Sequence, residues 1–237
     1  MSKACRQTAN TAAHTCQKII GMNINYDVLF KKNTDKADLN FPQKLLLHAC
    51  CAPCSAYCLT QVLPYYDVTL YYANDNITDR AEWEKRLGEL AKLTDIVNKG
   101  EFATQPITPL KLAVRPIDAQ RYYSIAKGLE TQPEGGARCA ECFKLRLADT
   151  ARYAQDNGFD LFGTTLSVSP YKNSVLLNEI GKSLQSDCLK WLYADFKKRN
   201  GYGESIRLSS LYGLYRQHYC GCDFSLIQAR QHAETDN

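Results

Sequence analysis

Between residues 44 and 98 the sequence alternates twice between a short apolar run and a helical pattern. The apolar runs cover residues 44–49 and 67–73, and each has the length of a buried strand. Helices are predicted over residues 55–63 and 80–98, because apolar residues recur there on one face. Strand-helix-strand-helix order predicts a right-handed parallel unit, in which ligands bind beyond the carboxyl ends of the strands.

The predicted helix over residues 80–98 also has a charged side. Its charged residues away from the apolar face are Glu82, Lys85, Arg86, Glu89 and Lys92. A helix of this kind packs its apolar face on a sheet and turns its charges elsewhere.

A second helix-strand-helix series follows along the chain. Helices are predicted over residues 139–158 and 173–181, with a strand over residues 159–166 between them. Weaker patterns predict a strand over residues 102–108 and a helix over residues 119–129. The predicted fold class is therefore α/β, with a Rossmann-like, mostly parallel sheet flanked by helices and a helical, Tyr-rich C-terminal part.

Residues 1–40 differ in character from the rest of the chain. They are polar and irregular, with one short helix at most, and we interpret them as an N-terminal extension. Residues 41–237 show no internal repeat and no low-complexity linker, so we predict a single α/β domain there.

Composition and charge restrict the compartment and the partners. The first ten residues, MSKACRQTAN, lack an apolar signal region, and no run approaches the roughly 18 apolar residues of a membrane span. We therefore expect a cytoplasmic, reducing compartment, where clustered cysteines are more often catalytic or metal-binding than structural. A net charge of +4 is low for a dedicated duplex binder, so any polynucleotide contact should be a local patch.

Eight of the eleven cysteines lie in three tight groups. The groups are Cys50, Cys51, Cys54 and Cys58; Cys139 and Cys142; and Cys220 and Cys222. Thiolates select soft metals such as iron-sulfur clusters, zinc or copper(I). Such grouping predicts metal-thiolate or dithiol chemistry.

Two of these groups together offer four converging thiolates. Cys139 and Cys142 share one face of a predicted helix start, and Cys50 and Cys51 follow a predicted strand in a loop. Four cysteines suit structural zinc or a four-iron cluster, and the position at a strand's carboxyl end favours the cluster. Cys54 is a rival ligand or the holder of a second metal.

The remaining cysteines of the groups differ from these four. Cys58 has hydrophobic spacing with Val62 on its predicted helix and is expected in the core. Cys220 and Cys222 are separated by one glycine, which makes joint ligation of one metal tight but permits a small, strained disulfide ring. Strained disulfides are the labile, catalytic kind, so this pair is interpreted as a two-electron relay.

Four motifs are similar to those of a known family. They are LLLHACCAP at residues 45–53, RCAECFKLR at residues 138–146, TTLSVSPYK at residues 164–172 and YCGC at residues 219–222. In order and spacing, over roughly residues 43–228, they resemble the QueH-type epoxyqueuosine reductases.

The resemblance implies an activity and a cofactor. The activity is the two-electron reduction of the epoxide of epoxyqueuosine, at the wobble position of tRNA, to the alkene of queuosine, the last step of tRNA queuosine biosynthesis. Cys50, Cys51, Cys139 and Cys142 match the family's positions for a 4Fe-4S cluster, and Cys220 and Cys222 match its redox-active disulfide-forming pair. Cys54 is left open as an extra ligand or as the ligand of an additional mononuclear metal. No corrinoid is implied.

The implied partners are tRNAs with a GUN anticodon, those for aspartate, asparagine, histidine and tyrosine, together with an external electron donor that the sequence does not identify. Basic and aromatic residues in two segments are candidates for contacts with an anticodon loop, whose bases stack on tyrosine and whose phosphates pair with cations. These candidates are Tyr171, Lys172, Lys198, Arg199, Arg207, Tyr215 and Arg216. Candidate proton donors are His48, Tyr171, His218 and Asp223.

Two other functions account for less of the sequence. A zinc-stabilised α/β nucleotide-binding or tRNA-thiolation enzyme, with structural cysteines, would carry a glycine- and serine-rich phosphate loop after the first strand, where this chain has CCAPC at residues 50–54. A non-enzymatic metal carrier or redox sensor would leave the basic, Tyr-rich segment before Cys220 unexplained.

Overall fold

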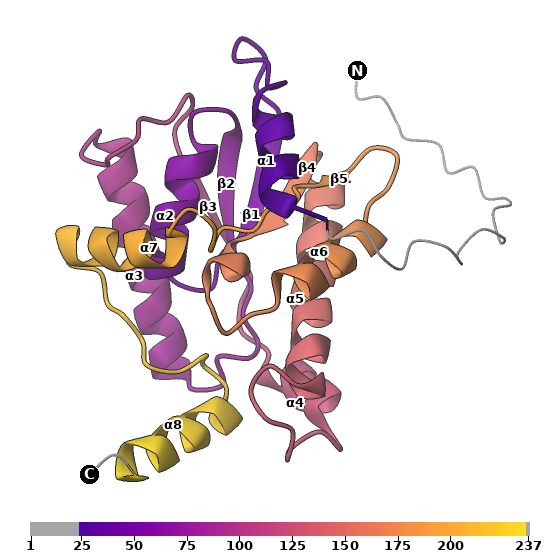
Figure 1. The fold of residues 1–237 in the computed structure, drawn as a ribbon, viewed down its shortest axis with the longest axis vertical. Helices are drawn as coiled ribbons and strands as arrows, with labels where there is room; N and C mark the ends of the chain where they lie inside the picture. The colour runs from indigo at the N-terminus through magenta and orange to yellow at the C-terminus, as the bar shows by residue number, and fades with distance from the viewer. Residues whose placement is uncertain (1–23, 236–237) are drawn as a thin grey trace, which may run out of the picture.

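A five-stranded parallel sheet forms the centre of the molecule (Figure 1). The structure, a computed structural model, describes residues 24–235. The strands are β1 Lys44–His48, β2 Asp67–Tyr72, β3 Lys111–Val114, β4 Leu161–Thr164 and β5 Lys190–Trp191, in the order β3-β2-β1-β4-β5. This order confirms the predicted α/β class. It places the point where the strand order reverses between β1 and β4, and open parallel sheets bind ligands at such a point.

Helices cover both faces of the sheet (Figure 1). They are α1 Tyr26–Thr34, α2 Ala52–Val62, α3 Arg80–Asn98, α4 Ala119–Ala126, α5 Ala137–Asp156, α6 Ser174–Ser183, α7 Gly201–Leu211 and α8 Asp223–Thr235, with a 3-10 helix at Thr165–Val168. Within residues 24–235, none of these helices has both the length and the apolar character that crossing a membrane requires.

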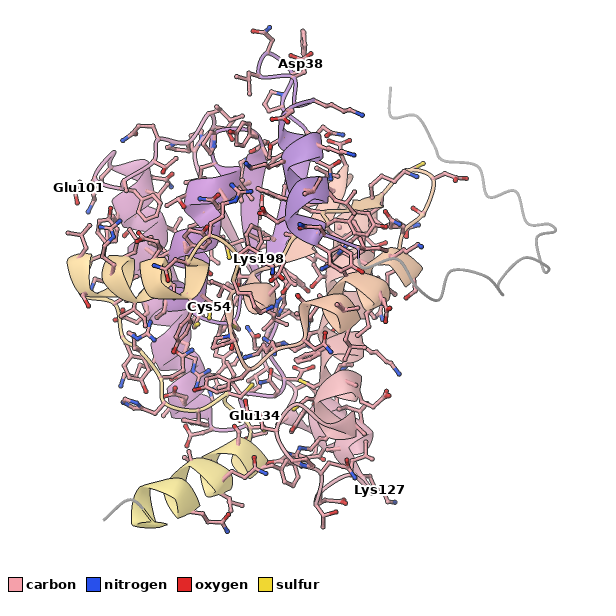
Figure 2. The ribbon with its side chains drawn as sticks, viewed as in Figure 1. Asp38, Cys54, Glu101, Lys127, Glu134 and Lys198 are labelled. Carbon is pink, nitrogen blue, oxygen red and sulfur yellow. The ribbon has the colours of Figure 1, made fainter. Side chains whose placement is uncertain are left out.

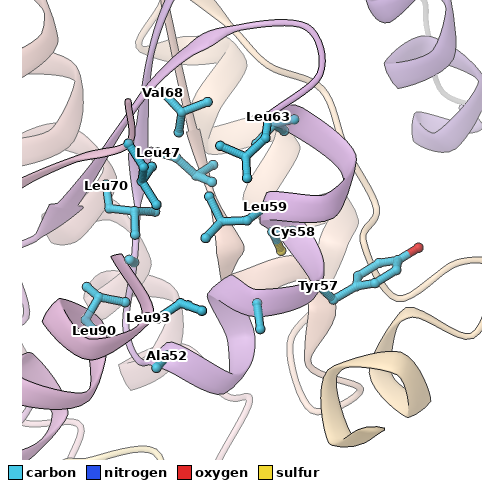
Figure 3. Close-up of a cluster of buried hydrophobic side chains, with 14 of the residues drawn as sticks. Leu47, Ala52, Tyr57, Cys58, Leu59, Leu63, Val68, Leu70, Leu90 and Leu93 are labelled. Atoms are coloured by element: carbon cyan, nitrogen blue, oxygen red, sulfur yellow. The ribbon is translucent and has the colours of Figure 1, made fainter. Parts of the chain in front are cut away.

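The side chains of β1 alternate between the two helical layers, as the period of two of a strand requires. Leu45 and Leu47 pack with residues of α2 and α3, as Figure 3 shows for Leu47, whereas Leu46 packs against α5 on the other face. Cys58 lies in the first of these clusters and is fully buried (Figure 3). The prediction that Cys58 is a core residue is thus confirmed.

The prediction of a strand over residues 102–108 was wrong. This stretch is irregular, and the strand β3 lies later, at Lys111–Val114. Pro106 lacks the N–H group that a ladder needs. The apolar Phe102 that suggested a strand is instead buried and packs against the tilted ring of Tyr212, with 5.2 Å between the ring centroids.

The described part of the polar N-terminal segment contains one short helix, α1. The side chain of Asn25 caps it by accepting hydrogen bonds from the N–H groups of Asp27 and Val28. Phe30 contacts Phe196 at a centroid distance of 5.4 Å, so α1 packs on the main body. The division of the chain at residue 40 stays a prediction.

Candidate metal and redox site

A cavity of about 860 Å³ lies beyond the carboxyl ends of β1 and β4, where the strand order reverses. The segment after β1 contributes Cys50 and Cys54, the segment after β4 contributes Leu166, and the loop before α8 contributes Cys220. Figure 2 labels Cys54 near the middle of the molecule and, below it in the view, Glu134, which also lines the cavity.

Three thiols converge directly after β1. The strand ends at His48 and α2 begins at Ala52, with Cys51 in extended conformation as its N-cap. The sulfur atoms of Cys50 and Cys51 are 3.6 Å apart, and those of Cys50, Cys51 and Cys54 all lie within 4.8 Å of one another. Neighbouring side chains diverge in regular structure, so the abrupt change from strand to helix brings these sulfurs together.

Burial and shared protons set the charge of this three-thiol group. Hydrogen bonds from the thiols of Cys51 and Cys54 hold the pKa of Cys50 well below its usual range, and the cations of Arg146 and Lys172 act in the same direction. Donation to Cys50 raises the pKa of Cys51 to about 12 and that of Cys54 well above its usual value. The thiols of Cys51 and Cys54 thus keep their protons more firmly than a free cysteine does, and a metal that bound all three sulfurs would displace those protons.

The Cys139 and Cys142 pair lies on the first two turns of α5, as its spacing predicts. The N–H of Gly135 donates to the sulfur of Cys139 at 3.3 Å. Cys142 is buried in a small cluster with Tyr122 and Cys222, and burial raises the pKa of its thiol to about 12. Cys139 packs against the cluster that contains Cys50 and Cys51, so α5 brings this pair to the side of the three-thiol group.

Cys220 and Cys222 are both free thiols. Cys220 lines the cavity, where burial raises its pKa against the opposing effect of the cations Lys172 and Arg146. Cys222 is buried, and its sulfur accepts a hydrogen bond of 3.4 Å from the N–H of Ser225. Gly221 between them has a φ of +125°, a conformation that strongly favours glycine.

The charged side of α3 holds the loop that carries this dithiol. Fully buried Arg86 donates to the carbonyl oxygen of Cys220 at 2.9 Å and to that of Tyr219 at 3.3 Å. The other contacts are Glu82 with the hydroxyl of Tyr215, Glu89 with the N–H of Tyr215, Lys85 with the ring of Tyr215, and Lys92 with the carbonyl oxygen of Gly213. The sequence predicts only that these five charges point away from the apolar face, because the loop residues that they contact lie more than a hundred residues away.

Arg146 is a second buried cation that sequence reasoning missed, although it stands in the RCAECFKLR motif. Its Nε donates to Nε2 of His48 at 3.3 Å, and its Nη2 donates to Oδ1 of Asn74 at 2.6 Å. Burial and the charge of Arg146 lower the pKa of His48 to about 3. Burial and this neighbour therefore favour the neutral form of the His48 imidazole.

The structure brings three of the seven candidate RNA-contacting residues to the cavity. Tyr171, Lys172 and Arg216 line it, and Arg216 lies over the ring of Tyr202, with 5.9 Å to the ring centroid. Burial lowers the pKa of Lys172, but electrostatic interactions with Cys220, Cys50 and Cys54 raise it above the usual value.

The other four candidates lie outside the cavity lining. Arg199 pairs with Asp27 of α1 at 2.6 Å, and Arg207 pairs with Glu204 at 2.8 Å. Tyr215 faces α3, and Lys198 is exposed (Figure 2). The lining also contains Gln217, which sequence reasoning did not single out and which donates to the sulfur of Cys51 at 3.0 Å.

Comparisons with known proteins agree on one family. The family model described as "Epoxyqueuosine reductase QueH" matches residues 45–228, a range that contains all three cysteine groups. A protein of that name from Staphylococcus epidermidis is 37% identical over 216 residues, which cover 89% of this chain and 88% of the relative. Relatives of the same name from Streptococcus pyogenes and Thermotoga maritima are each 35% identical, over 89% and 80% of this chain and 84% and 94% of their own lengths.

Proposed function

The chain belongs to the epoxyqueuosine reductase QueH family, and from this premise we propose that the cysteine-lined cavity is the site at which the epoxide is reduced. The protein is an oxidoreductase that converts epoxyqueuosine, at the wobble position of tRNA, to queuosine. The relatives do not favour a zinc-stabilised nucleotide-binding or tRNA-thiolation enzyme. The observation that carries the placement of the site is that two cysteine groups line one cavity, through Cys50, Cys54 and Cys220. The third group lies beside them, since Cys139 packs against the cluster that contains Cys50 and Cys51, and Cys142 packs with Cys222.

The residues present fit an iron-sulfur cofactor. Cys50, Cys51, Cys139 and Cys142 would hold a 4Fe-4S cluster, with Cys54 as an extra ligand or as the ligand of an additional mononuclear metal. Support comes from the soft donors themselves, from the 4.8 Å grouping of Cys50, Cys51 and Cys54, and from the two helix starts beside them, which favour thiolates. Bound there, such a cluster would transfer electrons between a donor and the substrate.

The Cys220 and Cys222 pair supplies the two electrons and two protons that the reaction consumes. The epoxide loses its oxygen and takes up two electrons and two protons, so that an alkene and water form. Oxidation of the two thiols to one disulfide releases two electrons and two protons. The position of Cys220 on the cavity wall supports this role, and an external reductant returns the pair to the dithiol.

The cavity is of the right size for an extruded nucleoside, since ligand pockets hold roughly 300–1,000 Å³. Single-stranded RNA is recognised by stacking of bases on aromatic rings and by cations on its phosphates. Tyr171, Lys172 and Arg216 are the proposed contacts at the cavity. Lys198, Arg199, Arg207 and Tyr215 remain predicted contacts farther along the anticodon stem-loop. The GUN-anticodon tRNAs for aspartate, asparagine, histidine and tyrosine, and a cytoplasmic location, also remain predictions.

Anaerobic purification tests the cofactor and the reaction together. We expect about four irons and four sulfides per chain, and conversion of epoxyqueuosine to queuosine in a modified tRNA, measured by mass spectrometry of the digested nucleosides. The same tRNA with guanosine at the wobble position is the control. Stoichiometric zinc without sulfide, or conversion that is unaffected by iron chelation, would overturn the cofactor assignment.

A further inference from the structure

Among residues 24–235, one amino group of the Arg146 guanidinium finds no hydrogen-bond partner. Only 2% of this residue is exposed, and its Nη1 makes no hydrogen bond with any described residue. Arg146 lines the cavity. A buried donor left unsatisfied costs about 1–3 kcal/mol, and more for a charged group, so this nitrogen is expected to have a partner in the working protein.

The two other nitrogens of Arg146 fix the direction in which Nη1 points. Arginine is only a donor, so Nε2 of His48 must accept from it, and the proton of the neutral imidazole lies on Nδ1, 3.0 Å from the hydroxyl of Thr164. Asn74 accepts from Nη2 through Oδ1 and donates through Nδ2 to the carbonyl oxygen of Ala49 at 2.9 Å. The ends of β1, β2 and β4 thus hold the guanidinium through His48, Asn74 and Thr164.

The residues around Arg146 indicate which kind of acceptor Nη1 binds in the working protein. Among the described residues that line the cavity, Glu134 is the one carboxylate, and it makes no ion pair with Arg146. Cys142 lies one helical turn before Arg146 on α5, on the same face. Cys142 and Cys50 also interact electrostatically with Arg146. Cysteines that bind a metal do so as thiolates, so in the metal-loaded protein anionic sulfur is the complement to this cation.

We propose that Arg146 is the fixed counter-cation of the cysteine centre, with Nη1 donating to anionic sulfur. The inference rests on the proposed iron-sulfur function and deepens it by naming a positioning residue. Reduction of the centre adds one negative charge, and nearby cations and hydrogen bonds to sulfur stabilise the more negative state. Arg146 therefore raises the reduction potential of the centre.

The test compares the potentials of anaerobically loaded proteins by spectroelectrochemical titration. The variants are R146Q, which removes the charge, R146K, which keeps the charge but not the two-pronged geometry, and R152Q. Arg152 is a matched control, because it lies on the same helix with its side chain 69% exposed. R146Q is expected to lower the equilibrium constant for reduction at least about tenfold, or 59 mV for a one-electron couple. R146K should give a smaller change of the same sign, and R152Q none.

Iron and sulfide are measured first, which separates the two hypotheses. A wild-type protein without iron and sulfide contradicts the proposed function, whereas loaded variants with wild-type potentials contradict the role of Arg146. A fall in kcat at unchanged potential would also overturn it, because Nη1 would then serve an oxygen of the substrate. If R146Q does not fold, R146K tests the proposal instead: a reduction potential below that of the wild type supports it, and a wild-type potential contradicts it.

Discussion

Replacing Gly221 by alanine tests whether the loop of the redox pair has one permitted conformation. Gly221 has a φ of +125°, and a Cβ added there would lie 2.8 Å from Cγ1 of Ile77 and 3.2 Å from Nη1 of Arg86. A residue held in such a backbone region costs roughly 1–3 kcal/mol, and overpacking costs roughly another 1–3 kcal/mol. Gly221→Ala should therefore lower the free energy of unfolding by about 2–6 kcal/mol.

Gly213→Ala is the matched control in the same segment. Gly213 also has a positive φ, of +57°, but the nearest atom to an added Cβ is Nζ of Lys92 at 3.7 Å. A left-handed residue without a steric conflict costs about 1–2 kcal/mol. The difference between the two variants thus measures the close approach of the loop to Ile77 and Arg86.

Urea unfolding in reducing buffer measures both free energies, and turnover with an external reductant measures the consequence for the redox pair. We expect Gly221→Ala to be the less stable variant and to lose multiple turnover, while Gly213→Ala keeps it. Equal losses of stability, within about 0.5 kcal/mol, together with wild-type turnover of both variants, would refute the view that this loop is held rigidly by α3.

Three further predictions concern other residues of the site. Cys220→Ser or Cys222→Ser should abolish multiple turnover and leave the absorbance of the metal centre intact; loss of that absorbance would make these residues ligands instead. Cys54→Ser should reduce the metal retained after anaerobic gel filtration, whereas Cys58→Ala, in the core, should not, and equal retention in both would count against Cys54 as a ligand. The pKa of His48 falls from 6.5 to about 3 on folding, so its contribution to stability is complete above pH 6.5 and is lost as the pH falls toward 3. Between pH 7 and pH 5 the loss of unfolding free energy due to His48 amounts to about 2 kcal/mol. Urea unfolding of a His48→Gln variant measures it. If that variant lost as much stability between these two pH values as the wild type, the lowered pKa of His48 would be contradicted.

Local sequence patterns predicted the structure where an element depends mainly on residues close to one another in the chain. The strand β1 and the pairing of Cys139 with Cys142 on α5 were predicted from spacing and apolar runs. The helix α2 was predicted too, but over residues 55–63, whereas it begins at Ala52 and includes Cys54. The strand β5, with two residues, is too short to leave a pattern. The error at residues 102–108 has a related cause, since Phe102 is apolar because it packs under α3 and Tyr212 and not because it belongs to a strand.

The buried charges were beyond prediction, because burial depends on segments far apart in the chain. Arg86 meets the carbonyl oxygen of Cys220 across 134 positions, and Arg146 meets His48 across 98 positions. In a linear sequence each arginine has the appearance of an ordinary solvent-exposed helix residue. Only the packing of α3 and α5 against the ends of the strands removes water from them and gives them fixed partners.

The sequence alone determined the fold class, the family resemblance and the thiols available to the site, since these depend on periodicity and spacing along the chain. The tertiary structure decided how the thiols are arranged. It placed Cys54 with Cys50 and Cys51 within 4.8 Å and brought Cys222 to Cys142. It also brought Tyr171, Lys172 and Arg216 to the cavity and left the other four RNA-contact candidates outside its lining. The physical reason is that burial, charge compensation and convergence are properties of chain segments in contact, and a sequence pattern does not record which segments meet.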